Sequence, residues 1–388
     1  VLSVVTVLTY SNAPPVPDQV TDGTGAVVFT GADIQKGQEV FFKYGLMEHG
    51  SLWGHGAYLG PDYSAEYLHR LSEVTRDTIA AETYGKRFAQ LSPDQQSAVS
   101  AGTIRVLKEN RYEPASRTLR FSPSEVAAYR IQLPEWSEYF TGKAAAPGLP
   151  ARYIQDSGEL KALTDYFAWA AWATTANRPG KDYSYTNNWP YEPNVGNRPS
   201  TEAYVWSALS LITLLSGIGL ILFVVGKFDY LGWQGEGASA YMMHSALSNP
   251  KTSSAGVKLT PSQWATGWFF ATVALLFLAQ AFLGGLLAHY RVETGAFYGF
   301  DMARWLPYNL ARTWHLQLAI FWVATAWVGG GLFLASMVGG EEPKYQKAGV
   351  YALFGALVLV AVGSLTGESL VSNNKLGKLG FWLGHEGP

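Results

Sequence analysis

The sequence of 388 residues contains no cysteine, and this absence excludes several kinds of chemistry. Without thiols the chain cannot form disulfides, iron–sulfur clusters, thiolate zinc sites or the thioether bonds that attach a c-type haem. Any haem must therefore be held non-covalently. The chain also lacks an excess of positive charge, since its formal net charge is −2. Because phosphate binding needs clustered Lys and Arg, we expect no nucleic acid among its partners.

Charge is scarce in the second half of the chain. Most of the Asp, Glu, Lys and Arg residues fall in residues 1–202, whereas residues 203–388 contain long uncharged runs rich in Leu, Val, Ala, Phe, Gly and Trp. A helix can cross a bilayer because it satisfies its backbone polar groups internally, and about 20 apolar residues are enough. The runs therefore predict four transmembrane helices, at about 203–226, 262–290, 313–340 and 348–367.

The first half of the chain is interpreted as a soluble domain preceded by a short apolar segment. Val1–Tyr10 is too short to span a membrane, so we interpret it as the end of a truncated transmembrane helix, with a secretory signal as the alternative. Residues 11–202 are polar, and the segments LSPDQQSAVSAGTIRVLKE and FSPSEVAAYRIQLPEWSEYFTG combine Ser-Pro starts with helical spacing of apolar residues. The prediction is a mainly α membrane protein with one large polar domain.

Among the seven histidines, only His315 lies well inside a hydrophobic run. An ionisable side chain within a membrane span is a functional candidate, and a neutral imidazole can be an axial ligand of haem iron. An interhelical hydrogen bond, with Gln317 or a threonine as partner, explains the same residue equally well. The residues alone leave both interpretations open.

His289 and Glu293 are four residues apart at the end of the second run, in LLAHYRVETG. They would share one face if the helix continues past the apolar residues. Oxidation of a quinol releases two protons and needs acceptors near the membrane edge, which such a pair would provide. A solvated pair that merely ends a helix is the simpler alternative. Arg291, between them, is expected to reach toward lipid headgroups.

The polar domain contains a segment dense in glycine and aromatic residues, KYGLMEHGSLWGHGAYLGPDYS at 43–64. Its glycine spacing, G-x-G-x-x-x-G, is one residue off the dinucleotide-binding pattern and has no strand–helix–strand periodicity around it. The segment is therefore interpreted as a Gly-rich turn. His49 and His55 are too few ligands for a zinc site.

Three long motifs resemble one known family, the quinol-dependent nitric oxide reductases of the haem–copper oxidase superfamily. They are GQEVFFKYGLMEHGSLWGHGAYLGPDYSAEYLHR, YTNNWPYEPNVGN and ARTWHLQLAIFWVATAW, in that order along the chain. The resemblance implies a soluble cytochrome c-like domain and the first transmembrane helices of a haem–copper-oxidase-type bundle. In related cytochrome c-dependent enzymes a CxxCH haem motif precedes a segment like Gly54–Pro61. Leu46–Gly50 stands in its place, so the resemblance implies a cytochrome c fold without haem.

The resemblance also implies roles for individual residues. His315 matches the axial ligand of a low-spin haem b. His289 and Glu293 match a proposed quinol-binding pair. Gly56, through its carbonyl, and Tyr58 match residues that help to bind a calcium ion, a cation that prefers oxygen ligands.

The family's catalytic metal ligands are not found in this sequence. The histidines for the non-haem iron and for haem b3, the histidines on later helices and the membrane-embedded glutamates are absent, and the sequence ends at LGHEGP, ahead of the segment with the family's calcium-binding glutamate. We therefore expect the N-terminal portion of a quinol-oxidising nitric oxide reductase, completed by the rest of the polypeptide or by a partner subunit. A non-catalytic quinol-binding subunit and another haem–copper oxidase are the alternatives.

The location of the polar domain is taken from the resemblance. Lys and Arg number five on each side of the predicted spans, so the positive-inside rule does not orient them. The family implies a bacterial inner membrane with the domain on the periplasmic side, and a homodimer is possible within it.

Overall fold

The computed structural model describes residues 2–142, 146–228, 259–297, 299–339 and 342–372. The chain is mostly helical, and it divides into two compact units. The first unit joins residues 1–199 with 275–321 and 359–388, and the second contains residues 200–274 and 322–358. Most of the expected loop at 227–261, and the final motif LGHEGP, lie outside the described residues.

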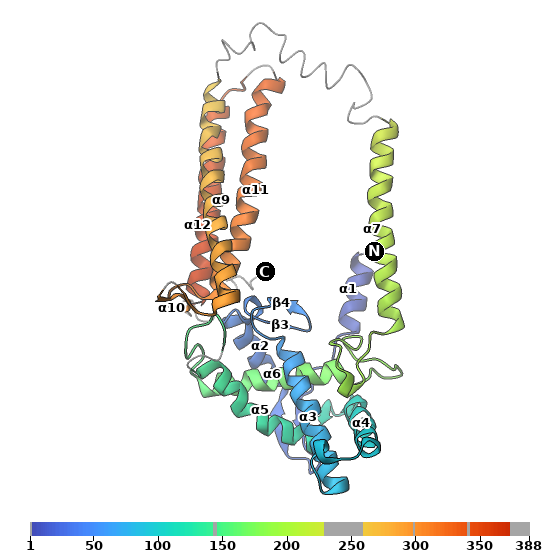
Figure 1. The fold of residues 1–388 in the computed structure, drawn as a ribbon. Coiled ribbons are helices and arrows are strands. Elements are labelled where there is room, and N and C mark those ends of the chain that lie inside the picture. The colour runs from blue at the N-terminus through green and yellow to red at the C-terminus, as the bar shows by residue number, and fades with distance from the viewer. Residues whose placement is uncertain (1, 143–145, 229–258, 298, 340–341, 373–388) are drawn as a thin grey trace. The chain divides into compact units, whose positions relative to one another are not determined.

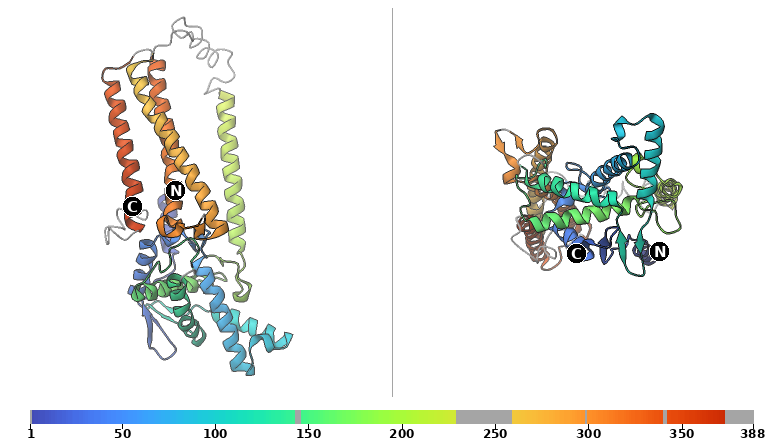
Figure 2. Two further views of the ribbon diagram at one scale, coloured as in Figure 1. Left: turned by 60° about the vertical axis from the view of Figure 1, so that its left-hand side comes forward. Right: turned by 90° about the horizontal axis from the view of Figure 1, so that it is seen from below.

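The polar domain is built around helix α6, Ser157–Thr175, which is buried along almost its whole length. Three helices pack against it, α2 (Gly31–Lys43), α3 (Tyr63–Tyr84) and α5 (Pro123–Thr141), as Figures 1 and 2 show. Their shared core is aromatic: the Tyr63 ring stacks on Phe167 with centroids 4.9 Å apart.

Helix starts in this domain follow the sequence signals. Helix α4, Pro93–Lys108, and helix α5 each begin at the proline of a Ser-Pro pair, with the serine as N-cap. In both helices the side chain three residues after the cap bonds back to the cap's own backbone, which satisfies backbone donors that the first turn leaves unpaired. The mainly helical domain predicted from the sequence is confirmed.

A small sheet closes one side of the domain. Its strand order is β2-β1-β6-β5, in which β1 (Gln19–Thr21) pairs antiparallel with β2 (Val27–Thr30) and parallel with β6 (Thr118–Arg120). The remaining short elements are β5 Tyr112–Glu113, η1 Leu46–Glu48, β3 Ser51–Leu52, β4 His55–Gly56, η2 Phe88–Gln90, η3 Pro193–Val195 and, at the N-terminus, α1 Leu2–Ser11.

Four helices are long and apolar enough to cross a membrane: α7 Thr201–Phe228, α9 Pro261–Glu293, α11 Tyr308–Gly339 and α12 Gln346–Ser372. Each covers nearly all of one of the four stretches expected from the sequence. Helices α9, α11 and α12 run alongside one another (Figure 1). In the first unit the Trp314 indole donates to the Leu365 carbonyl, and in the second Phe269 packs on Phe354.

A short connection between α9 and α11 belongs to the first unit. It contains the strand pair β7 (Ala296–Phe297) and β8 (Phe300–Asp301), followed by the helical turn α10, Met302–Trp305. Phe297 is buried in a cluster of apolar side chains from α9 and α11. This packing places the connection against the end of α9.

Candidate functional site

His289 and Glu293 form a hydrogen-bonded pair at the end of α9. The helix continues past the apolar run to Glu293, and the His289 Nδ1 lies 2.9 Å from the Glu293 Oε1. Both side chains are partly exposed. Because a carboxylate only accepts hydrogen bonds, this contact favours the tautomer with the proton on Nδ1 and the basic lone pair on Nε2. The spacing expected from the sequence thus produces a carboxylate-oriented imidazole.

An aromatic residue holds the ring of this pair. Phe297 of β7 stacks on the His289 imidazole with centroids 5.1 Å apart and planes 20° apart. The neighbouring Tyr290 is fully buried, and its hydroxyl donates to the Leu306 carbonyl after α10. The connection after α9 therefore restricts the orientation of the His289 ring.

His315 lies in α11 and hydrogen-bonds across to α9. Its Nδ1 is 2.9 Å from the Gln280 carbonyl oxygen. A carbonyl oxygen can only accept, so Nδ1 carries the proton and Nε2 carries the lone pair. Within the described part of the chain no hydrogen bond is found at Nε2. The sequence had suggested Gln317 or a threonine as the partner; the backbone of α9 takes that place.

A glycine of α9 provides the space for the His315 ring. A Cβ added at Gly284 would lie 3.0 Å from His315 Cε1, whereas one added at the adjacent Gly285 would meet nothing within 4 Å. The ring therefore sits close against the α9 backbone. A histidine that donates one ring proton to a carbonyl while its second nitrogen remains basic has the arrangement common among metal-ligating histidines.

Two arginines at these helix ends contact the Gly-rich segment of the polar domain. Arg312, near the start of α11, donates to the Glu48 carboxylate, and Arg291 donates to the Tyr58 carbonyl. Arg291 thus donates a hydrogen bond to a backbone oxygen of the same unit, and the expectation that it reaches toward lipid headgroups stays a prediction. Neither contact is visible in the sequence, since the partners are more than 200 residues apart.

His49, which the resemblance aligns with the histidine of a haem motif, is a buried core residue. Its Nδ1 lies 2.8 Å from the Tyr63 hydroxyl, and its Nε2 lies 2.8 Å from the Pro147 carbonyl. Burial lowers the pKa of His49 from its ordinary value to about 4. Both ring nitrogens are engaged, so neither is available to a metal.

Gly56 and Tyr58 lie on the segment that the arginines contact. Gly56 has a φ of +139°, and a Cβ there would lie 2.4 Å from the Gly50 oxygen, so the position suits only glycine. The Tyr58 side chain is exposed. Calcium takes six to eight oxygens. Two residues of this segment would leave most of that shell to other groups, and the calcium role stays a prediction.

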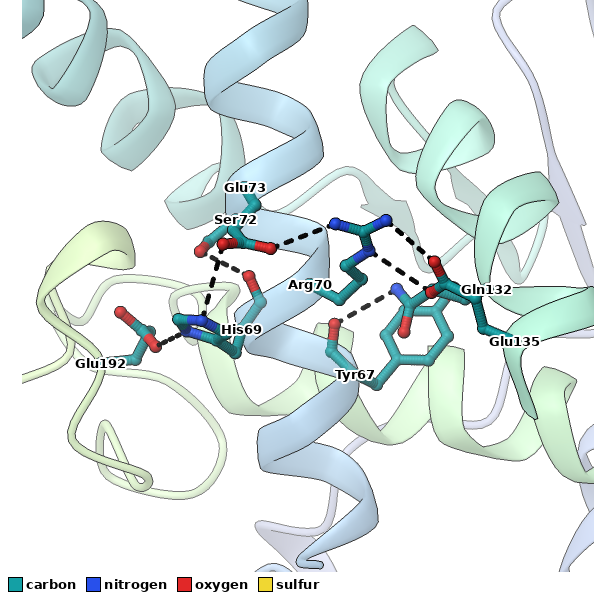
Figure 3. A network of polar contacts seen from close by, with 8 residues as sticks. All are labelled: Tyr67, His69, Arg70, Ser72, Glu73, Gln132, Glu135 and Glu192. Carbon is teal, nitrogen blue, oxygen red and sulfur yellow. Dashed lines mark hydrogen bonds and ion pairs between the residues drawn. The ribbon is translucent and has the colours of Figure 1, made fainter. Parts of the chain in front are cut away.

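A second His–Glu contact lies on the surface of the polar domain, where it belongs to a network of ion pairs (Figure 3). His69 Nδ1 lies 2.8 Å from Glu192, and Arg70 bonds to Glu73 and Glu135. The hydrogen bond to Glu192 is the main cause that raises the pKa of His69. This pair resembles His289–Glu293 in geometry, but no transmembrane helix accompanies it.

The sequence analysis did not identify several residues of the first unit that the structure shows to be paired, closely packed or buried. Glu48 and Arg312 are ordinary charged residues in the sequence, and Gly284 is one of many glycines in apolar runs. Glu368 was missed because the apolar run was ended at residue 367, although α12 continues to Ser372 and buries this carboxyl to 2 % exposure. The signal that could have identified Glu368 is a charged residue directly after an apolar run, where the helix can continue without a break.

The chain matches two family models. Residues 17–191 match the NorB cytochrome c-like domain of nitric oxide reductase, and residues 264–385 match cytochrome c and quinol oxidase polypeptide I. A comparison with individual curated proteins gives no match. The first match covers the polar domain with its buried His49, and the second includes His289, Glu293 and His315.

Proposed function

We propose that this chain, a NorB-like member of the haem–copper oxidase family, is the quinol-oxidising, electron-entry part of a nitric oxide reductase. The family matches make it an oxidoreductase-type membrane protein. The quinol, the haem b ligand and the role as entry point are our proposal. We place it in the bacterial inner membrane with the polar domain on the periplasmic side.

The hydrogen bond between His289 and Glu293 carries the proposal. Oxidation of one quinol releases two electrons and two protons. The His289 imidazole would take the two hydroxyl protons one after the other at Nε2, and the Glu293 carboxylate would stabilise the imidazolium each time. Because both side chains are partly exposed, each proton can pass on to water. The pair lies at the end of a candidate membrane span, where the ring of a lipid-soluble quinol can approach it.

His315 fits an axial ligand of haem b, because its Nδ1 donates to a carbonyl and its Nε2 carries the lone pair. When bound, this haem supplies a one-electron carrier between the quinol and the catalytic metals. The polar domain supplies no second haem ligand through His49, whose nitrogens both have partners. Electrons from a quinol, rather than from a haem in this domain, agree with that arrangement.

The complete reaction would be 2 NO + 2 e⁻ + 2 H⁺ → N₂O + H₂O, and one quinol supplies its two electrons. Among the described residues no group of three or more His, Cys, Asp or Glu could hold a metal ion. On the resemblance to the family, we assign haem b3 and the non-haem iron to residues outside this sequence, on the same polypeptide or on a partner. The intact mass of the purified protein distinguishes those two arrangements.

The test is quinol-dependent turnover of the assembled enzyme with His289→Gln and Glu293→Gln. Loss of a proton acceptor should lower kcat/KM for quinol by about 100-fold, while the haems stay bound and are still reduced by dithionite. His69→Gln is the matched control, because it removes a comparable His–Glu contact from the surface of the polar domain. Quinol kinetics unchanged by both α9 substitutions would reduce the pair to a solvated helix end.

A further inference from the structure

We infer that Glu48 and Arg312 form an ion pair that sets the reduction potential of the haem held by His315. The inference rests on the proposed haem role of His315. Glu48 lies in the Gly-rich segment of the polar domain, directly before the buried His49. Its carboxylate accepts a hydrogen bond from Arg312 of α11, one of the four candidate membrane spans.

The two charges are fixed close to the ligand helix. Arg312 precedes His315 by three residues in α11, and residues three apart lie on the same side of a helix. The Arg312 guanidinium donates to Glu48 Oε2. The two side chains are 25 % and 19 % exposed, so water and salt screen them less than a surface pair.

Neighbouring contacts hold both partners in place. One turn before Arg312, the Asn309 amide donates to the Tyr44 carbonyl and to the Tyr153 hydroxyl. On the other side, Glu48 is followed by His49, which is anchored by two hydrogen bonds. Hydrogen bonds therefore fix both the start of α11 next to Arg312 and the segment that contains Glu48.

The charges of the two residues should shift the reduction potential of the haem in opposite directions. Reduction adds an electron to the iron, so a nearby positive charge stabilises the reduced form and a nearby negative charge stabilises the oxidised form. Glu48→Gln leaves the Arg312 charge uncompensated and should raise the potential. Arg312→Gln leaves the Glu48 charge uncompensated and should lower it.

The experiment is a redox titration of the low-spin haem absorbance in the assembled enzyme. We expect each substitution to change the ratio of reduced to oxidised haem at a fixed potential by about threefold to tenfold, in opposite directions; tenfold corresponds to about 59 mV for one electron. Arg312→Lys keeps the charge and should stay near the wild-type value. Glu135→Gln, which removes a carboxylate bonded to Arg70 on the polar domain (Figure 3), should change nothing.

The directions of the two changes in reduction potential distinguish this role from damage to the fold. A distorted site would shift the haem potential of both variants in the same direction. Shifts of the same sign, or unchanged potentials with the haem bound, overturn the inference. If Arg312→Gln does not assemble, Glu48→Gln alone decides, since an absent upward shift overturns it. Retention of the low-spin haem after removal of His315 would instead overturn the proposed function itself.

Discussion

Two histidines of the first unit, His49 in the polar domain and His315 in α11, have similar surroundings and different chemical capacities. Each has one ring nitrogen at a backbone carbonyl, His49 at Pro147 and His315 at Gln280. Each packs closely against a glycine of the same unit. The difference is the second nitrogen. In His49 the second nitrogen, Nδ1, is hydrogen-bonded to the Tyr63 hydroxyl. In His315 the second nitrogen, Nε2, carries a lone pair and has no hydrogen bond in the described part of the chain.

This comparison shows that the partner of the second ring nitrogen decides whether a buried histidine can act as a ligand. At His49 a tyrosine takes the bond that a metal would need, and the tyrosine ring is itself stacked on Phe167 in the aromatic core. A buried imidazole with both nitrogens hydrogen-bonded contributes to folding and has no nitrogen left for a metal. At His315 the ring is oriented in the same way, but its basic nitrogen is not used by the protein, and ligation remains chemically possible.

Removal of the His315 ring should have the largest effect and tests the comparison most directly. We expect His315→Ala to abolish the low-spin haem b absorbance of the assembled enzyme, because alanine has no nitrogen with which to bind the iron. The check is the reduced-minus-oxidised spectrum with a pyridine haemochrome count. His49→Leu is the matched variant, and it should leave the haem count unchanged. A normal low-spin spectrum in the His315 variant would contradict the ligand role.

Removal of the His49 ring should affect stability instead. Its folded pKa of about 4 lies below the unfolded value of about 6.5, so the unfolded state binds the proton first. The stabilisation by neutral His49 is fully present above pH 6.5 and is lost as the pH falls through about 4. The shift corresponds to on the order of 3 kcal/mol.

This pH dependence can be measured as thermal unfolding of the purified protein by near-UV circular dichroism between pH 4 and 8. The wild type should lose stability over the acidic part of that range, and His49→Leu should be less stable at pH 7 and show a smaller dependence. At His69 the pKa is raised, so its contribution has the opposite sign: it is present below about pH 6.5 and lost as the pH rises. An equal pH dependence in wild type and His49→Leu would show that burial of His49 does not control acid stability.

The fold was largely predictable because its signals are local. Length and apolarity identify α7, α9, α11 and α12, and Ser-Pro caps identify the starts of α4 and α5. The spacing of His289 and Glu293 also predicts their contact, since four residues make one helical turn. These inferences need no information about distant parts of the chain.

The parts of the site that could not be predicted depend on contacts between distant segments. The partner of His315 is a backbone carbonyl, which has no sequence signature. The contact of Glu48 with Arg312 joins residues 264 apart. Only packing decides which of many charged residues meet, and only packing shows that the second nitrogen of His49 is engaged while that of His315 is not.

Gly284 provides the finest test of the His315 geometry. A Cβ at this position would lie 3.0 Å from His315 Cε1, closer than an ordinary contact, so Gly284→Ala should tilt the ring and strain its bond to the Gln280 carbonyl. We expect a partial loss of low-spin haem, or a shifted low-spin signal in electron paramagnetic resonance, with assembly retained. Gly285→Ala is the control, because it adds the same methyl group to the same helix where nothing lies within 4 Å. Equal spectra for the two variants would mean that close packing against α9 does not orient the His315 ring.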